Sequence, residues 1–250
     1  MKSDNPAISP RIRNYRLAGS YNFRDIGGYE TADGRHVRWG QVFRSDAVHR
    51  LTDGDLDQLR PLGVRTILDL RSHREITASG SGLIHDEPGL NVVHIPFGRI
   101  GEEADPTWQE LTLGQLYRGI VVEAKGAIGQ VMTTLAESDS LPAVVHCAAG
   151  KDRTGVSIAL LLRLLGVDDA TITEDYVLTE SNFSNFLDRL SPEELEHLKI
   201  IPDELMRVDA TVLAATFAIV DTQYGSTGAY LRDAGVAPDA IATLRRRLLG

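Results

Sequence analysis

The single cysteine of this 250-residue chain lies in the segment HCAAGKDRTG, residues 146–155. Five residues separate Cys147 from Arg153, and a loop of this length can curl so that its backbone N–H groups point at one centre. Such a nest binds a tetrahedral dianion, and the planar guanidinium of Arg153 can hold two of the dianion's oxygens. The loop residues expected to contact a bound phosphate are Ala148, Ala149, Gly150 and Lys151.

The same loop is expected to activate the sulfur. A helix predicted to begin at about Arg153 directs its positive end at the loop centre. This field favours an ionised Cys147, and a thiolate that faces a phosphoryl group can attack it in line. We therefore predict Cys147 as the nucleophile and Arg153 as the group that stabilises the phosphoryl oxygens. Thr154 is expected to donate its hydroxyl to the sulfur, His146 to orient the loop, and Lys151 to add positive charge at the pocket mouth.

Protonation of the leaving oxygen requires an acid beside the loop. The candidates are Asp152 in the loop, Asp105 in the acidic segment that follows residue 98, Asp69 at the end of a predicted strand, and a water molecule. An ion pair with Lys151 or a nearby arginine is the alternative role for Asp152. The alternative role for Asp69 is to orient Arg153.

The predicted elements place the loop between a buried strand and a buried helix. The stretch AVVHC at 143–147 is apolar enough for a central strand, and the helix that begins in the loop is apolar nearly all round up to Gly166. Strands that alternate with helices predict an α/β fold with a mostly parallel central sheet flanked by helices. Further predicted strands span 37–44, 64–70 and 92–97, and predicted helices follow Thr52 and cover much of 109–137 and 168–249.

Charge and hydropathy limit the partners of the chain. The net charge of −9 argues against nucleic-acid binding, which needs a basic face. No apolar stretch approaches the roughly 20 residues of a membrane span, so stable membrane insertion is not expected. Residues 1–20 contain no apolar core of the signal-peptide type, so a cytoplasmic location is the default and export without a cleaved signal stays open.

Other anion-binding functions, and metal binding, agree less well with the sequence. The nucleotide-binding pattern GxxxxGK[ST] fails, because Asp152 follows Gly150 and Lys151. A lone cysteine argues against arsenate relays that need resolving thiols. The seven histidines show no ligand spacing, so neither a metal nor another cofactor is expected. A non-catalytic phosphate-binding module remains the rival from another class.

The loop resembles the signature of the protein tyrosine phosphatase superfamily. Lys151 and Asp152 within it are similar to the atypical bacterial tyrosine phosphatases that carry an HCxxGKDRTG loop. The resemblance covers about residues 15–250 and implies one phosphatase domain behind a flexible arm of residues 1–14. It is carried also by NFRDIGG at 22–28, FRS at 43–45, DLRS at 69–72 with Glu75, DY at 175–176, YGS at 224–226 and YLRDAG at 230–235.

The resemblance implies a substrate class and a lid. Family members act on phosphotyrosine in proteins, often also on phosphoserine or phosphothreonine and on phosphoinositides, with the loop lysine associated with inositide activity. A helical lid over the pocket is implied, formed by the region after Phe97 or by the helices after Leu178. The family also favours Asp152 as the acid, since no Trp-Pro-Asp sequence is present. The oligomeric state is left open.

Overall fold

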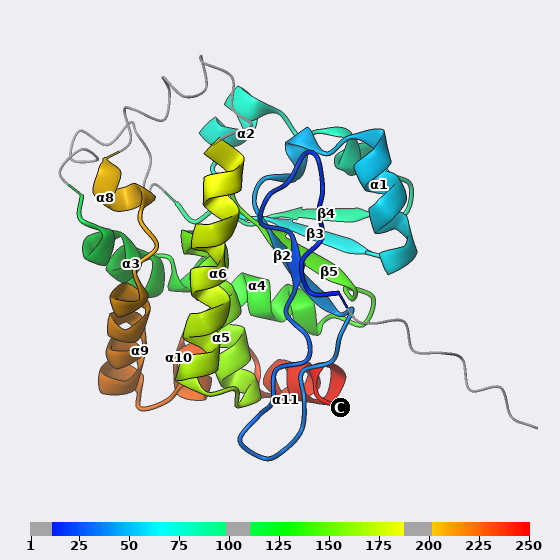
Figure 1. The fold of residues 1–250 in the computed structure, drawn as a ribbon. Coiled ribbons are helices and arrows are strands. Elements are labelled where there is room, and N and C mark those ends of the chain that lie inside the picture. Colours follow the sequence, from blue (N-terminus) through cyan, green and yellow to red (C-terminus); the bar gives the residue numbers. More distant parts are fainter. Residues whose placement is uncertain (1–11, 99–110, 188–201) are drawn as a thin grey trace, which may run out of the picture.

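The computed structural model describes residues 12–98, 111–187 and 202–250. Within these residues, five strands form one sheet in the order β1-β2-β5-β3-β4. β2, β5, β3 and β4 run parallel, and only the short β1 is antiparallel to its neighbour. Strand β5 is therefore central, and helices lie on both faces of the sheet (Figure 1). The strands are β1 (Arg24–Asp25), β2 (Val42–Ser45), β3 (Thr66–Asp69), β4 (Asn91–His94) and β5 (Ala143–His146).

Side-chain alternation along β5 divides the core between the two faces. Ala143, Val145 and then Cys147 join the larger apolar cluster, whereas Val144 joins the smaller one. The larger cluster is built with α3 (Leu113–Val122), α4 (Lys125–Ala136), α5 (Asp152–Leu165), α6 (Asp169–Leu187), α8 (Asp203–Met206), α9 (Ala210–Tyr224), α10 (Thr227–Asp233) and α11 (Pro238–Leu248). The smaller cluster is built with η1 (Val48–Arg50), α1 (Asp53–Leu59) and η3 (Leu83–Asp86), and Leu62 of η2 (Arg60–Leu62) packs against it. The short helix α2 (His73–Ser79) follows β3.

Helix α5 is the central helix that follows the loop. Its side chains are buried on nearly every side, and it ends at Gly166, which takes the left-handed conformation with φ 94°. This arrangement confirms the predicted order of strand, loop and core helix. The helix predicted after Thr52 is also confirmed as α1, at whose start Thr52 and Asp55 exchange hydrogen bonds in a capping box.

One long helix predicted over much of 109–137 is wrong. The chain forms α3 and α4 with a break at Glu123 and Ala124, and Ala124 has non-helical dihedral angles. The break lets α3 pack on α9 while α4 packs on α11, so each half buries its apolar face against a different partner. The predicted strands at 37–44 and 92–97 are present but shorter.

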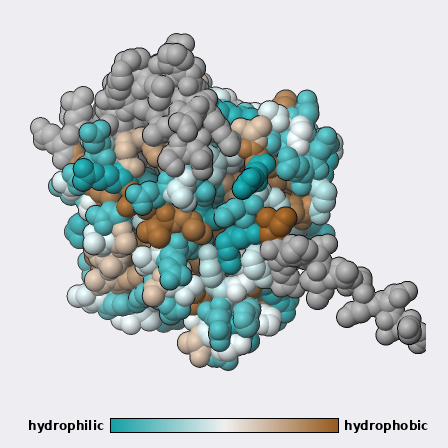
Figure 2. Space-filling view, in the orientation of Figure 1, coloured by the Kyte–Doolittle hydropathy of each residue, from teal (hydrophilic) through white to brown (hydrophobic). Residues whose placement is uncertain are grey.

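The face drawn in Figure 2 carries small hydrophobic patches separated by hydrophilic residues. Among the described residues, Ile12 and Leu83 are the large hydrophobic side chains that are exposed. None of the described helices combines the length and the apolar character needed to cross a bilayer.

Candidate active site

The carbonyl groups of the loop after β5 are held from outside the loop. The carbonyl of Ala148 accepts a hydrogen bond from the Ala47 amide at 2.9 Å, and the carbonyl of Ala149 accepts from the Tyr21 hydroxyl at 3.0 Å. The side-chain amide of Asn22 also donates to the Ala149 carbonyl, at 3.2 Å. These donors come from the chain before β1 and after β2, which flank the loop.

Gly150 receives two further hydrogen bonds on its carbonyl. Asn22 donates at 3.2 Å and the buried Arg44 guanidinium donates at 2.8 Å. In a trans peptide the carbonyl of one residue and the N–H of the next point in opposite directions. The amides that follow these three carbonyls, those of Ala149, Gly150 and Lys151, are therefore turned toward the inside of the loop, as an anion nest requires.

The loop passes so close to β2 that only glycine fits at position 150. Gly150 has φ 66°, and a Cβ atom there would lie 2.4 Å from the carbonyl oxygen of Ser45. Both the left-handed dihedral angle and the contact exclude a side chain. This close contact with Ser45 holds the turn of the loop at Gly150 against the end of β2.

Cys147 and His146 stand at the start of the loop. Cys147 is 2% exposed. The His146 ring is fully buried, and its Nδ1 lies 3.3 Å from the Cys147 carbonyl, an acceptor, so the ring donates from this nitrogen. Burial lowers the pKa of His146 to about 4, so the ring is neutral near pH 7. Its role in this geometry is to hold the first residue of the loop.

Arg153, in the first turn of α5, is already oriented by a carboxylate. Its Nη1 and Nη2 donate to the two Glu75 oxygens at 2.6 and 2.7 Å, and Nη1 also donates to the Leu70 carbonyl at 3.3 Å. A guanidinium has five N–H donors. No described group accepts from Nε or from the second Nη2 proton, so the Nε–Nη2 edge of Arg153 can grip a phosphate by two bonds.

The expectation that Asp69 orients Arg153 is wrong. Asp69 is buried and pairs with Arg71, whose Nη2 donates to it at 2.6 Å. Burial opposes ionisation of Asp69, but the Arg71 hydrogen bonds outweigh it and lower its pKa to about 2. An ionised carboxylate with its oxygens engaged by a guanidinium is not a general acid, so Asp69 is removed from the acid candidates as well.

Asp152, the first residue of α5, keeps both roles considered for it. Its Oδ1 lies 3.4 Å from Lys151 Nζ and forms no hydrogen bond with a described group. Burial raises the pKa of Tyr117 and Tyr176, and the Asp152 charge raises it further, which places the carboxylate beside two phenols. Asp152 thus lies at the start of α5, directly after the loop, with Lys151 paired to it, so the ion-pair role and the acid role both stay open.

Lys151 is not at the pocket mouth. Its side chain is 6% exposed, and Nζ donates to the carbonyls of Leu205 at 2.5 Å and Arg207 at 2.8 Å. These carbonyls lie at the end of α8 and just after it, so Lys151 joins the loop to the helical region expected to supply the lid (Figure 1). The expectation of a lysine facing the substrate is thus corrected to a buried tether.

Thr154 and Asp105 are the two remaining predicted site residues. The Thr154 hydroxyl is buried and has no described hydrogen-bond partner, so the expected bond to the Cys147 sulfur is not formed in this structure. Asp105 lies outside the described residues, as do most of the segment 98–111 and residues 1–11 of the N-terminal arm.

Comparison with known proteins decides the family. The pattern of the "Tyrosine phosphatase family" matches residues 15–250. The chain belongs to this tyrosine phosphatase family. It is 32% identical to the "Triple specificity protein phosphatase PtpB" of Mycobacterium tuberculosis, over 94% of this chain and 98% of that protein. It is 30% identical to a "Tyrosine-protein phosphatase" of Nostoc commune, over 82% of this chain and 73% of that protein.

Among solved structures, this tyrosine phosphatase family member is similar to P. aeruginosa TpbA. The likeness covers 96% of this chain and 97% of that chain, with 14% identity and a TM-score of 0.39. Membership of the family therefore rests on the sequence matches, and the α/β architecture rests on the structure described above.

A buried ion network braces the phosphatase loop from behind. Asp175 on α6 pairs with Arg24 at 3.1 Å and with Arg44 at 2.6 Å, and Tyr29 donates to it at 3.0 Å. Arg44 also holds the Gly150 carbonyl, so α6, β1, β2 and the loop are joined through buried charges. The opposite charges satisfy one another and let two guanidiniums remain inside the protein.

Sequence reasoning missed the residues that clamp the loop from a distance. Tyr21 and Asn22 hold loop carbonyls, and Glu75 holds Arg153, although Asn22 and Glu75 belong to segments that carried the family resemblance. Asp46 is also missed: it accepts from the Ser20 hydroxyl at 2.5 Å and from the Asn22 amide at 3.0 Å, and so fixes the segment that carries Tyr21. Glu75 had one local signal, a capping box with Ser72.

Proposed function

We propose that this phosphatase hydrolyses phosphotyrosine in proteins, and also phosphoserine and phosphothreonine, through a phosphocysteine intermediate on Cys147. The observation that carries the proposal is the loop itself. Its carbonyls are held outward, its amides turn inward, and Arg153 keeps one two-donor edge free beside Cys147. The name of the triple-specificity relative supports the wider substrate range.

The first step transfers the phosphoryl group to sulfur. The Cys147 thiolate attacks phosphorus and forms a P–S bond as the bond from phosphorus to the substrate oxygen breaks. The inward amides and Arg153 stabilise the three equatorial oxygens, whose charge is greatest in the transition state. Asp152 gives its proton to the leaving oxygen, so that tyrosine departs as a neutral phenol.

The second step regenerates the enzyme. Water attacks the phosphorus of phosphocysteine while the Asp152 carboxylate takes one of its protons. The P–S bond breaks, its electron pair returns to sulfur, and inorganic phosphate leaves. The Thr154 hydroxyl, which has no described partner, is available to donate to the departing thiolate. Neither step requires a metal ion.

Phosphate release from a phosphotyrosine peptide and a phosphothreonine peptide tests the proposal. The assay is run in the presence of a chelator with the native chain and with Cys147→Ser. We expect release by the native chain and none by the variant, together with a ³²P-labelled intermediate trapped only when Cys147 is present. Release that survives in Cys147→Ser would reject the phosphocysteine route, and no release on either peptide would favour a phosphate-binding module.

The identity of the acid is tested by the leaving group. An acid matters for the poor leaving group of phosphotyrosine and much less for p-nitrophenol. We expect Asp152→Asn to lower kcat on phosphotyrosine by about 100-fold or more and on p-nitrophenyl phosphate far less. Asp105→Asn is the matched variant. A large loss on phosphotyrosine in Asp105→Asn, with little loss in Asp152→Asn, would instead identify Asp105 as the general acid.

A phosphoinositide substrate is the second candidate. It is favoured by the lysine in the loop, which the family resemblance associates with inositide activity. In the described geometry Lys151 donates to Leu205 and Arg207, so it reaches an inositol phosphate only after leaving these carbonyls. A phosphoinositide panel with native chain and Lys151→Met decides: inositide activity lost selectively in Lys151→Met would support this candidate, and equal loss on peptides would reject it.

A further inference from the structure

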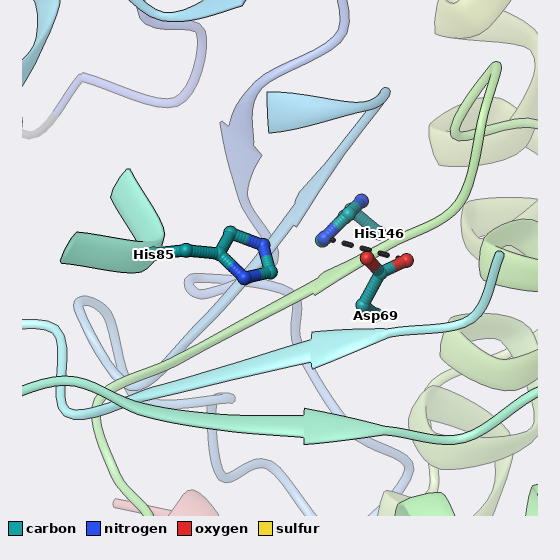
Figure 3. A group of neighbouring side chains, drawn as sticks. All are labelled: Asp69, His85 and His146. Carbon is teal, nitrogen blue, oxygen red and sulfur yellow. Dashed lines mark ion pairs between the residues drawn. The ribbon is translucent and has the colours of Figure 1, made fainter. Parts of the chain in front are cut away.

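A cluster of three potential metal ligands lies behind the catalytic loop. Asp69 ends β3 and His146 ends β5, and the parallel register pairs these two residues directly. Their positions in the strand alternation place them on the face of the smaller apolar cluster, opposite to the face that receives Cys147. His85 reaches the same point from η3, which covers this face (Figure 3).

The distances suit a small cation. One ligand atom from each of Asp69, His85 and His146 lies within 4.8 Å of the other two, and His146 Nε2 lies 3.7 Å from Asp69 Oδ1. Zinc binds imidazole and carboxylate at about 2.0 to 2.2 Å, which places tetrahedral ligand atoms about 3.4 Å apart. Side-chain rotations that bring the three atoms together by about an ångström would therefore give three of the four tetrahedral ligands the required spacing.

Two imidazole nitrogens in the cluster lack partners. Nε2 of the fully buried His146 and Nε2 of His85 are both buried, and neither forms a hydrogen bond with a described group. Buried polar atoms are normally satisfied, so two such atoms that face one carboxylate need an explanation. His146 donates its Nδ1–H to the Cys147 carbonyl, which leaves the lone pair on Nε2, the arrangement that metal-binding histidines adopt.

We propose that Asp69, His85 and His146 form a binding site for a first-row transition metal cation of the Zn²⁺ type. Two imidazoles and a carboxylate are the donor set that such cations accept. The absence of ligand spacing along the sequence had predicted no metal site. The three residues are separated by 15 and by 60 intervening positions. The register of β3 with β5 brings Asp69 to His146, and η3 brings His85 to both.

Arg71 sets the strength of this site. Its guanidinium already pairs with Asp69, so a metal ion must share the carboxylate with it. The adjacent positive charge weakens cation binding. We therefore expect an exchangeable ion, held less tightly than zinc in a structural site with thiolate ligands.

An ion at this site would act on the catalytic loop. His146 directly precedes Cys147, and its ring holds the Cys147 carbonyl. Drawing Nε2 toward Asp69 and His85 shifts the ring, and with it the hydrogen bond that holds the first loop residue. Metal binding should therefore lower kcat without any metal contact at the sulfur.

Zinc titration of the Cys147→Ser protein tests the site apart from the catalytic thiol. Zn²⁺ is competed against a chromophoric chelator, with His85→Gln and His49→Gln added separately to this background. His49 is the matched control, because it is also a half-buried histidine in a short 3-10 helix with an unpartnered ring nitrogen. We expect stoichiometric binding that weakens at least about tenfold in His85→Gln and is unchanged in His49→Gln. No binding in the Cys147→Ser background, or equal affinity in all three proteins, would overturn the proposal.

Inhibition of the intact enzyme tests the coupling to the loop. The Zn²⁺ concentration that halves the rate on p-nitrophenyl phosphate should rise at least about tenfold in His85→Gln and stay unchanged in His49→Gln. A chelator should restore each rate. Inhibition at the same concentration in all three proteins would place the inhibitory ion at the Cys147 thiolate and reject the coupling.

Discussion

Glu75 is expected to control the reaction without contacting the substrate. It takes both end nitrogens of the Arg153 guanidinium, at 2.6 and 2.7 Å, and so leaves the Nε–Nη2 edge for the phosphate. Burial opposes ionisation of Glu75, but the Arg153 charge outweighs it and lowers the Glu75 pKa. The carboxylate is therefore ionised throughout the neutral range, and Glu75→Gln removes its charge.

The size of the effect follows from the hydrogen bonds lost. A glutamine side chain offers one carbonyl oxygen, so one of the two charge-assisted bonds to Arg153 disappears. Such a bond contributes about 1.5 to 3 kcal/mol. If the loss is felt fully in the transition state, kcat/KM falls by about 10- to 150-fold.

The substitution spares the helix that carries Glu75. The Glu75 carboxylate also accepts from the Ser72 amide at 2.6 Å in the capping box of α2. Glutamine performs the same capping function, so α2 should remain folded. The effect on Arg153 is thereby separated from a general loss of structure.

Steady-state kinetics on a phosphotyrosine peptide, with thermal unfolding in parallel, measure the effect. Glu87→Gln is the matched control, because Glu87 also holds an arginine by two bonds, to Arg60 at 2.9 and 3.2 Å, but at the surface. We expect no change in kcat/KM for this control. An unchanged kcat/KM in Glu75→Gln, or an equal loss in Glu87→Gln, would refute the view that Glu75 positions Arg153.

Four further predictions follow from single contacts. Gly150→Ala should lower the free energy of unfolding by about 2 kcal/mol or more in urea titrations, because the added Cβ would meet the scaffold at 2.4 Å; an unchanged midpoint would contradict the close approach. Asp175→Asn should lower it by about 3 to 5 kcal/mol, because two buried guanidiniums lose their counter-charge, and a loss below 1 kcal/mol would argue against the network. Burial raises the pKa of Asp46 to about 6 from 3.8, so the folded state binds a proton more readily and this contribution to stability is lost as pH rises through 6. Relative to Asp46→Asn, the native chain should thus gain about 1 kcal/mol between pH 7 and pH 5, and a difference independent of pH would reject the shift. Lys151→Met should speed amide hydrogen exchange at residues 203–207, since two hydrogen bonds to α8 are lost, and unchanged exchange there would contradict the tether.

The sequence predicted the parts of the fold that depend on neighbouring residues. The strand at 143–146, the loop and the core helix up to Gly166 were predicted from an apolar run, a Cys-to-Arg spacing and a helix-ending glycine. The helix that follows Thr52 was predicted from local sequence as well. The break between α3 and α4 was not, because it depends on which distant helices each half packs against.

The candidate site divides along the same line. The roles expected for Cys147 and Arg153 come from the loop's own length and chemistry, and the described geometry accommodates both. The expected role of Asp69 beside Arg153 failed, because Asp69 is paired by its near neighbour Arg71 and Glu75 takes its place. Lys151 was expected at the pocket mouth, but a helix more than fifty residues later offers it two carbonyls.

The sequence by itself predicted an anion-binding loop with a nucleophilic cysteine, because all residues of that loop lie within ten consecutive positions. Tertiary structure alone decided what holds the loop in place. Tyr21, Asn22 and Arg44 reach the loop carbonyls, and the pairing of β3 with β5 brings Asp69 to His146. These contacts join segments that are distant along the chain, and nothing in the local sequence of either segment indicates its partner. Strand order and register decide which segments meet, and both depend on burying the two faces of the sheet together.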